Sequence, residues 1–152
     1  MRYLRYAILL AAFVVPADAA QQGSKPASSG GQAITVYRTA TCGCCGLWVD
    51  HLKGAGFNPT VHMVTSMSEA PPHKRVPAAL HSCHTATLEG YIVEGHVPAD
   101  VIRQLLAERP KVVGIAVPGM PPGSPGMESP KPQPYEVLTF DENGRTTVYA
   151  RR

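Results

Sequence analysis

Hydrophobic and polar positions change their spacing along the chain, and the changes predict a strand, a helix and a second strand at the start of the folded part. A short β-branched run at 34–38 predicts the first strand. Residues 47–52 have the apolar spacing of a buried helical face and predict the helix. Residues 57–64 predict a second strand. A helix between two strands makes them parallel.

The pattern after residue 84 predicts a hairpin followed by a second helix. The β-rich runs 85–88 and 91–94 flank a glycine, which is typical of a hairpin. An apolar stripe within 101–106 predicts a helix that ends before Pro110. The preceding segment, 66–82, is ambiguous, because its three prolines exclude a long helix and leave room only for short turns.

The last part of the chain combines a long loop with a hairpin. Residues 116–134 contain seven prolines and three glycines, which predicts an irregular loop. The β-rich runs 135–140 and 146–149 flank an Asn-Gly pair, a strong turn signal. The order of elements therefore predicts an α/β fold of thioredoxin-like topology (βαβ then ββα), with an added C-terminal β-hairpin and a long Pro/Gly-rich loop.

The N-terminus has the features of an export signal. Arg2 and Arg5 precede an apolar run at 7–15, and Ala17-Asp18-Ala19 offers a small-x-small cleavage pattern. The run is too short to span a bilayer, which takes about 20 residues, so no stable membrane anchor is expected after cleavage. We expect a signal peptide at 1–19, a flexible Gly/Ser-rich linker at 20–33 and one thioredoxin-like metal-binding domain at 34–152. The expected location is the periplasm.

Composition and charge exclude several other classes of protein. The net charge is only +3, and no basic stripe is interleaved with aromatic residues, so nucleic acid is not an expected partner. The carboxylates show no pairing of the kind used by glycosidases, and no glycine-rich phosphate loop is present.

Three of the four cysteines lie within four positions, between the first strand and the first helix. Cys42 and Cys45 have the spacing of a thioredoxin-type redox pair, but Cys44 between them does not belong to that pattern. In a thioredoxin-like topology the segment that enters the first hairpin strand lies beside this turn. That segment carries Cys83 and no proline. The sequence thus predicts a pocket of four thiolates.

Thiolates of this kind select soft metals: Cu(I), zinc or iron–sulfur clusters. A helix N-terminus lowers the pKa of a cysteine and favours the thiolate. Successive helical side chains point about 100° apart, so Cys44 and Cys45 do not easily bind one ion together. That divergence favours bridging thiolates in a multinuclear Cu(I) cluster over a single tetrahedral ion.

Histidines and methionines near these cysteines are further candidate ligands. His84 adjoins Cys83, although neighbouring strand residues face opposite ways. Met120 and Met127 lie in the Pro/Gly loop, which could fold over a Cu(I) site or pass copper onward. His51 is about 10 Å along the helix from Cys44, too far to bind the same ion, and is expected to be packed or at the surface. His96 precedes the second helix and is either a metal ligand or a residue of the helix cap, with the cap slightly favoured. For His62, His73 and His81 solvent exposure is the default expectation.

Four segments together resemble one known family, the exported CopG-like metal-binding proteins associated with bacterial copper resistance, which are unrelated to the DNA-binding regulator of the same name. The resemblance rests on Thr-Cys-Gly-Cys-Cys-Gly-x-Trp-x-x-His (41–51), Ser-Cys-His-Thr-Ala (82–86), Gly-Tyr-x-x-Glu-Gly-His-Val-Pro (90–98) and Ala-Val-Pro-Gly-Met-Pro-x-Gly-Ser-Pro-Gly-Met (116–127). It implies a thioredoxin-like fold whose cysteines bind a copper cluster. It also implies a role in copper handling, with interconversion of Cu(I) and Cu(II).

The sequence therefore predicts a periplasmic copper-binding protein of copper resistance that receives or delivers copper among other periplasmic copper-handling proteins. Its expected copper ligands are Cys42, Cys44, Cys45 and Cys83, with His84, Met120 and Met127 as auxiliaries. Turnover between Cu(I) and Cu(II) would make it a copper oxidoreductase. Two alternatives stay open: a thiol–disulfide oxidoreductase that uses Cys42 and Cys45, and a passive zinc or mercury scavenger.

Overall fold

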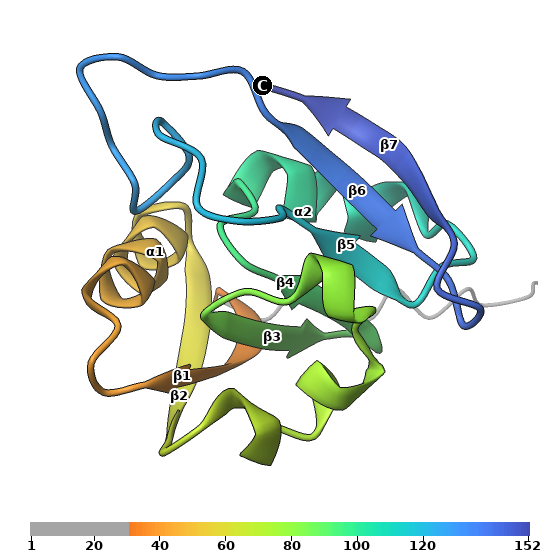
Figure 1. The fold of residues 1–152 in the computed structure, drawn as a ribbon, viewed down its shortest axis with the longest axis horizontal. Helices are drawn as coiled ribbons and strands as arrows, with labels where there is room; N and C mark the ends of the chain where they lie inside the picture. Colours follow the sequence, from red (N-terminus) through yellow and green to blue (C-terminus); the bar gives the residue numbers. More distant parts are fainter. Residues whose placement is uncertain (1–30) are drawn as a thin grey trace, which may run out of the picture.

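A computed structural model describes residues 31–152 of the protein, so the expected signal peptide and most of the expected linker lie outside the described residues. The described part forms one mixed sheet of seven strands in the order β2-β1-β3-β4-β5-β6-β7, together with two α-helices (Figure 1). The predicted α/β class is confirmed. Within residues 31–152, neither helix is long and apolar enough to cross a membrane.

The elements follow the predicted order closely. The helices are α1 (Gly43–Gly54) and α2 (Ala99–Glu108). The strands are β1 (Gln32–Thr39), β2 (Phe57–Val64), β3 (His84–Leu88), β4 (Tyr91–Glu94), β5 (Gly114–Ala116), β6 (Glu136–Phe140) and β7 (Thr146–Arg151). Between β2 and β3 lie three short 3-10 helices, η1 (Met67–Glu69), η2 (Pro72–Arg75) and η3 (Ala78–Leu80).

The first four strands have the predicted thioredoxin-like arrangement. β1 pairs with β2 in parallel, and α1 connects them. β3 runs antiparallel to both β1 and β4. The register of the hairpin sets Thr85 opposite Glu94. β1 begins at Gln32, inside the expected linker, because pairing with β2 extends to its first residue.

The C-terminal hairpin is a continuation of the same sheet. β5, a three-residue strand that runs parallel to β4 after the α2 crossover, is not among the elements predicted from the sequence. β5 pairs antiparallel with β6, and β6 with β7. So short a run has no recognisable period of its own, and only its two neighbouring strands define it.

The sheet has an apolar core on each face. Trp48, Leu52, Ile102 and Leu105, all fully buried, pack from the helices onto one face together with alternate strand residues such as Val93. On the opposite face, Val76, which follows η2, and Leu80 of η3 pack against Phe140 and other strand residues. Successive strand residues point to opposite faces of the sheet, so the strands also present apolar side chains on the face away from the helices. The ambiguous segment 66–82 covers this second core.

A buried polar network lies on β3 and β4, close to Cys83. Glu94 is fully buried; the Thr85 hydroxyl donates to its Oε2, and the Ser82 backbone N–H donates to Oε1 at 2.6 Å. His73 Nδ1 lies 3.1 Å from the same Oε1. The expectation that His73 is solvated is therefore wrong. The network fixes the backbone of Ser82, the residue immediately before Cys83.

Burial of Glu94 affects its ionisation. Desolvation raises the pKa of this carboxyl to about 8, although its hydrogen bonds from Thr85 and Ser82 oppose the shift. The protonated carboxyl is thus the form that the fold accommodates at neutral pH.

The Pro/Gly loop between β5 and β6 reaches across to α1 before it returns to β6 (Figure 1). Its turn at 124–128 is closed by a hydrogen bond from Met127 N–H to Ser124 O of 2.8 Å. Gly126 is at the contact with the helix, with a φ of +84°, and a Cβ at this position would lie 2.7 Å from Cys44 O. The close approach of the loop backbone to α1 therefore requires a glycine here.

We expect Gly126→Ala to destabilise the protein by about 1–3 kcal/mol, the usual cost of forcing an added group into a packed site. Gly119→Ala is the matched control, because Gly119 also has a positive φ (+70°) but its Cβ would meet nothing within 4 Å. Urea unfolding of both variants measures the difference. An equal loss in the two variants would mean that backbone strain alone, and not contact with α1, sets the cost.

The second prediction concerns pH. The folded-state pKa of Glu94, about 8, lies above its reference value of 4.5, so ionisation favours the unfolded chain. Its contribution to the free energy of unfolding is complete below pH 4.5 and is lost as the pH rises through about 8. Glu94→Gln should lack this loss, while Glu142→Gln, at an exposed position, should keep the wild-type profile. Urea unfolding across this pH range provides the test, and parallel wild-type and Glu94→Gln profiles would contradict the assignment.

Candidate metal centre

The cysteine turn caps the N-terminus of α1. Cys42 is the N-cap residue, and its Sγ lies 3.3 Å from the backbone nitrogen of Cys45, which donates to it. A sulfur thus takes the place that a serine or aspartate oxygen usually occupies. Arg38, on β1, donates from Nη1 to the carbonyl of Cys42 at 2.7 Å. The helix dipole and this guanidinium both favour negative charge on the sulfurs.

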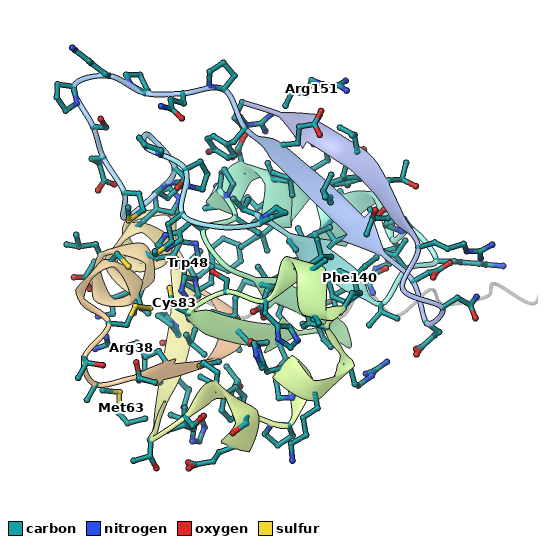
Figure 2. The ribbon with its side chains drawn as sticks, viewed as in Figure 1. Arg38, Trp48, Met63, Cys83, Phe140 and Arg151 are labelled. Carbon is teal, nitrogen blue, oxygen red and sulfur yellow. A yellow bond between two sulfur atoms is a disulfide. The ribbon has the colours of Figure 1, made fainter. Side chains whose placement is uncertain are left out.

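Cys83 joins the turn from the other side. It immediately precedes β3, and its Sγ lies 3.3 Å from Cys45 Sγ. Figure 2 shows Cys83 next to α1, close to Trp48. All four cysteine sulfurs lie within 4.8 Å of one another. The expected convergence of Cys83 on the other three cysteines is present in the structure.

Two of the four cysteines form a disulfide in this structure. Cys42 and Cys45 are bonded to each other, whereas Cys44 and Cys83 are free. Cys44 Sγ lies 3.5 Å from Cys42 Sγ, and Cys45 is fully buried while Cys44 is half-buried. The sulfurs of the two adjacent cysteines nevertheless lie within 4.8 Å of each other, so their different burial does not keep them from one metal centre. A set of four thiols requires the reduced form of the protein.

Burial keeps the Cys83 thiol protonated at neutral pH. Desolvation, with the neighbouring Cys44 as a second cause, raises the pKa of its thiol to about 11, while the Ser82 hydroxyl opposes the shift. A metal that binds Cys83 must displace this proton, so the affinity for metal rises with pH.

Two histidines face the same sulfur. His84 Nε2 lies 2.9 Å from Gly95 O, and because a carbonyl only accepts, Nε2 carries the proton. His84 Nδ1 is left with a free lone pair, 3.7 Å from Cys83 Sγ. In His96 the roles are reversed: Nδ1 donates to Pro125 O at 2.8 Å, and Nε2 lies 3.8 Å from Cys83 Sγ.

Both imidazoles are fully buried and uncharged at neutral pH. Desolvation lowers the pKa of His84 to about 3, with the neighbouring His96 as a further cause. Desolvation also lowers the pKa of His96, against the hydrogen bond to Pro125. Trp48 packs its ring on His84, with centroids 4.4 Å apart. The neutral ring is the form that binds metals.

His96, for which the sequence slightly favoured a place in the helix cap over a role as ligand, faces the Cys83 sulfur. The hairpin register contains the signal that would have identified it. Thr85 pairs with Glu94, so the same register, continued by two residues, sets Cys83 opposite His96. The positive φ of Gly95 (+71°) turns the chain just after β4, and only the folded hairpin shows that His96 then points back to the sulfur.

The remaining candidates take different positions. Met120 is 52% exposed, and Met127 is half-buried in the turn that packs on α1. His51 accepts a hydrogen bond of 3.1 Å from Ala99 N–H at the start of α2, so it is a packed histidine, as expected. His62 is exposed and stacks on Tyr37. His81 is exposed and stacks on His73.

Comparison with known proteins places these features in context. Residues 80–127 match a family described only as proteins of unknown function, DUF411. No curated protein matches the chain. Two solved structures, both of a copper resistance protein CopG (forms 1 and 2), are 45% identical to this chain with a TM-score of 0.74.

Each of these structures matches 80% of this chain and 98% of its own. The resemblance that the cysteine, histidine and loop motifs predicted is thus confirmed along nearly the whole of the solved proteins. The cysteine cluster and the copper resistance relatives support a metal-binding role in copper resistance. The protein described here therefore belongs to the CopG copper resistance family.

Proposed function

We propose that this protein binds Cu(I) on the thiolates of Cys42, Cys44, Cys45 and Cys83 in the periplasm, as part of copper resistance. The convergence of four sulfurs within 4.8 Å at a helix N-terminus carries the proposal. The copper resistance relatives support the choice of metal. The disulfide between Cys42 and Cys45 must be reduced before all four sulfurs are available.

The arrangement of the sulfurs favours several copper ions over one. Cys44 Sγ lies 3.5 Å from Cys42 Sγ, and Cys45 Sγ lies 3.3 Å from Cys83 Sγ. The sulfurs thus form two close pairs, one at each end of the Cys42–Cys45 disulfide. Thiolates shared between neighbouring Cu(I) ions suit such pairs. The guanidinium of Arg38 and the N-terminus of α1 then offset part of the negative charge of the cluster.

The auxiliary ligands are His84, Met120 and Met127. His84 Nδ1 is 3.7 Å from Cys83 Sγ and extends the donor set. Met127 lies in the turn against α1, and the exposed Met120 suits the receipt of copper from, or its release to, other periplasmic copper-handling proteins.

The same cysteines can exchange electrons with copper. Two thiolates, Cys42 and Cys45, give up two electrons when they form their disulfide, and two Cu(II) ions that accept those electrons become two Cu(I) ions. The disulfide form in this structure is the protein product of such a step. Activity of this kind would make the protein a copper oxidoreductase.

A second candidate function is thiol–disulfide exchange. The observation in its favour is the Cys42–Cys45 disulfide at the helix N-terminus, with Cys42 half-buried and Cys45 fully buried. Against it, free Cys44 and Cys83 lie beside the two ends of that disulfide, where they would compete with any substrate thiol. Zinc or mercury scavenging by the same thiolates is the third candidate.

The first test of the proposal is the metal content. We expect the anaerobically purified, reduced protein to hold several Cu(I) ions per chain, and Cys83→Ser to lose most of them. Met63→Ala is the control variant, because it removes a soft sulfur ligand outside the site. Met63 is 53% exposed on β2, away from Cys83 (Figure 2). Elemental analysis measures the content. A Cu(I) content of Cys83→Ser equal to that of the wild type would contradict the four-thiolate site. Retention of zinc in the presence of excess Cu(I) would favour the candidate function of zinc scavenging.

The second test separates copper binding from thiol–disulfide exchange. A Cys44→Ser variant should lose part of its Cu(I), and neither it nor the wild type should reduce insulin at the rate of a dithiol catalyst. A thiol–disulfide oxidoreductase would instead keep its insulin reduction in this variant, because the Cys42–Cys45 pair is unchanged. Full insulin reduction by Cys44→Ser, with unaltered copper content, would replace the proposal with the second candidate.

A further inference from the structure

Glu94 is the one fully buried carboxyl in the described part of the chain, and it belongs to neither group of potential metal ligands. It lies on β4, the middle strand of the seven-stranded sheet. The strands on both sides hold its backbone, because Thr85 pairs with it on β3 and the Val117 N–H donates to its carbonyl at 3.0 Å. The carboxyl therefore stands on a rigid part of the fold.

Three neighbours fix the orientation of this carboxyl. The Thr85 hydroxyl donates to Oε2, and His73 Nδ1, on η2, lies 3.1 Å from Oε1. The Ser82 backbone N–H donates to Oε1 at 2.6 Å. Glu94, Thr85 and His73 are all buried. Thr85 and His73 thus set the rotation of the carboxyl so that Oε1 faces Ser82.

Ser82 needs this partner, because it lies outside the strand ladder. β3 begins at His84, and the acceptor of the Ser82 N–H is a side chain instead of a strand carbonyl. Gly95 limits the same segment from a second direction: its φ is +71°, and a Cβ there would lie 2.9 Å from Ser82 Oγ. The peptide that leads into Cys83 is therefore held between Glu94 and Gly95.

The position of Cys83 depends on this segment more than the other cysteines do. The other three sit together on the turn that begins α1, so one local structure places them all. Cys83 depends on how the chain enters β3, and neither residue directly before it is a proline that would stiffen the chain. Its Sγ lies 3.3 Å from Cys45 Sγ, a contact that a small displacement of the Ser82–Cys83 peptide would open.

We propose that Glu94 is a positioning residue for Cys83, and that its carboxyl holds the Ser82–Cys83 peptide so that the sulfur is in place before a metal binds. The proposal rests on the proposed function, in which Cys83 is a Cu(I) ligand. The property that matters is a fixed acceptor for the Ser82 N–H. An apolar side chain of similar size fills the same space but leaves that N–H without a partner.

The decisive experiment compares Glu94→Leu and Glu94→Gln in the reduced protein, with Cu(I) titrated anaerobically against a chelator of known affinity. We expect Glu94→Leu to bind Cu(I) about tenfold more weakly, the usual effect of losing a group that orients a ligand. Glu94→Gln should keep the wild-type affinity, because its amide oxygen still accepts from Ser82 and its amide nitrogen can donate to Thr85. An affinity of Glu94→Leu equal to that of the wild type, or an equal loss in Glu94→Gln, would overturn the proposal.

Phe140→Leu is the matched control for a loss of stability alone. Phe140 is fully buried in the second core, so its truncation lowers the free energy of unfolding. The variant should bind Cu(I) as the wild type does under conditions in which both are folded. A loss of affinity equal to that of Glu94→Leu would mean that Glu94 acts only through stability, and would overturn the positioning role.

A double-variant cycle tests whether Glu94 acts through Cys83. In the Cys83→Ser background, Glu94→Leu should have no further effect on Cu(I) affinity, because the group that it positions is already gone. A further loss as large as that in the wild-type background would contradict the proposal.

A further measurement needs no substitution of the buried carboxyl. In reduced protein labelled with nitrogen-15, we expect the Ser82 amide to exchange slowly with solvent before Cu(I) is added, and its exchange to stay slow afterwards. Exchange of this amide in the metal-free protein as fast as that of an exposed loop amide would overturn the proposal, even if Glu94→Leu failed to fold.

Failure of this proposal and failure of the proposed function give different results. A wild-type Cu(I) content in Cys83→Ser contradicts the proposed function, and the positioning role falls with it. Loss of Cu(I) in Cys83→Ser, with wild-type affinity in Glu94→Leu, contradicts the positioning role alone.

Discussion

The contact between Trp48 and His84 is the interaction on which the candidate centre depends. Trp48 is fully buried on α1, its ring packs on His84 at the start of β3, and its indole N–H holds the carbonyl of Val97 after β4. One side chain thus joins the three segments that supply the cysteines, His84 and His96. Loss of the indole would leave a large cavity between these segments and release the ligands from their common geometry.

Cys83 belongs both to the group of four cysteines and to a second group of potential metal ligands, Cys83, His84 and His96. In the reduced protein it completes a set of four sulfurs, and in the disulfide form it keeps two neutral imidazoles as partners. Burial keeps its thiol protonated and both imidazoles uncharged, so the metal-free centre carries little charge. Formation of the Cys42–Cys45 disulfide therefore removes two of the four sulfurs as metal ligands.

The segment that matches the family of unknown function, 80–127, contains Cys83, both candidate histidines and the turn that packs on α1. The cysteine turn itself lies outside that match. The matched segment builds one side of the centre, and β1 with α1 builds the other. The four cysteine sulfurs converge only when β3 pairs with β1, whereas Cys83, His84 and His96 all lie within the matched segment.

The sequence alone determined the order of the elements, the thioredoxin-like start of the sheet and the four cysteines, because these follow from periodicity, turn residues and local spacing. It could not determine β5, whose three residues are defined by pairing with neighbouring strands. It also placed His73 in solvent and His96 at a cap, although both are buried. Only the tertiary structure decided these positions, because burial and ligand orientation depend on strand register and on the loop that returns to α1, which no local pattern encodes.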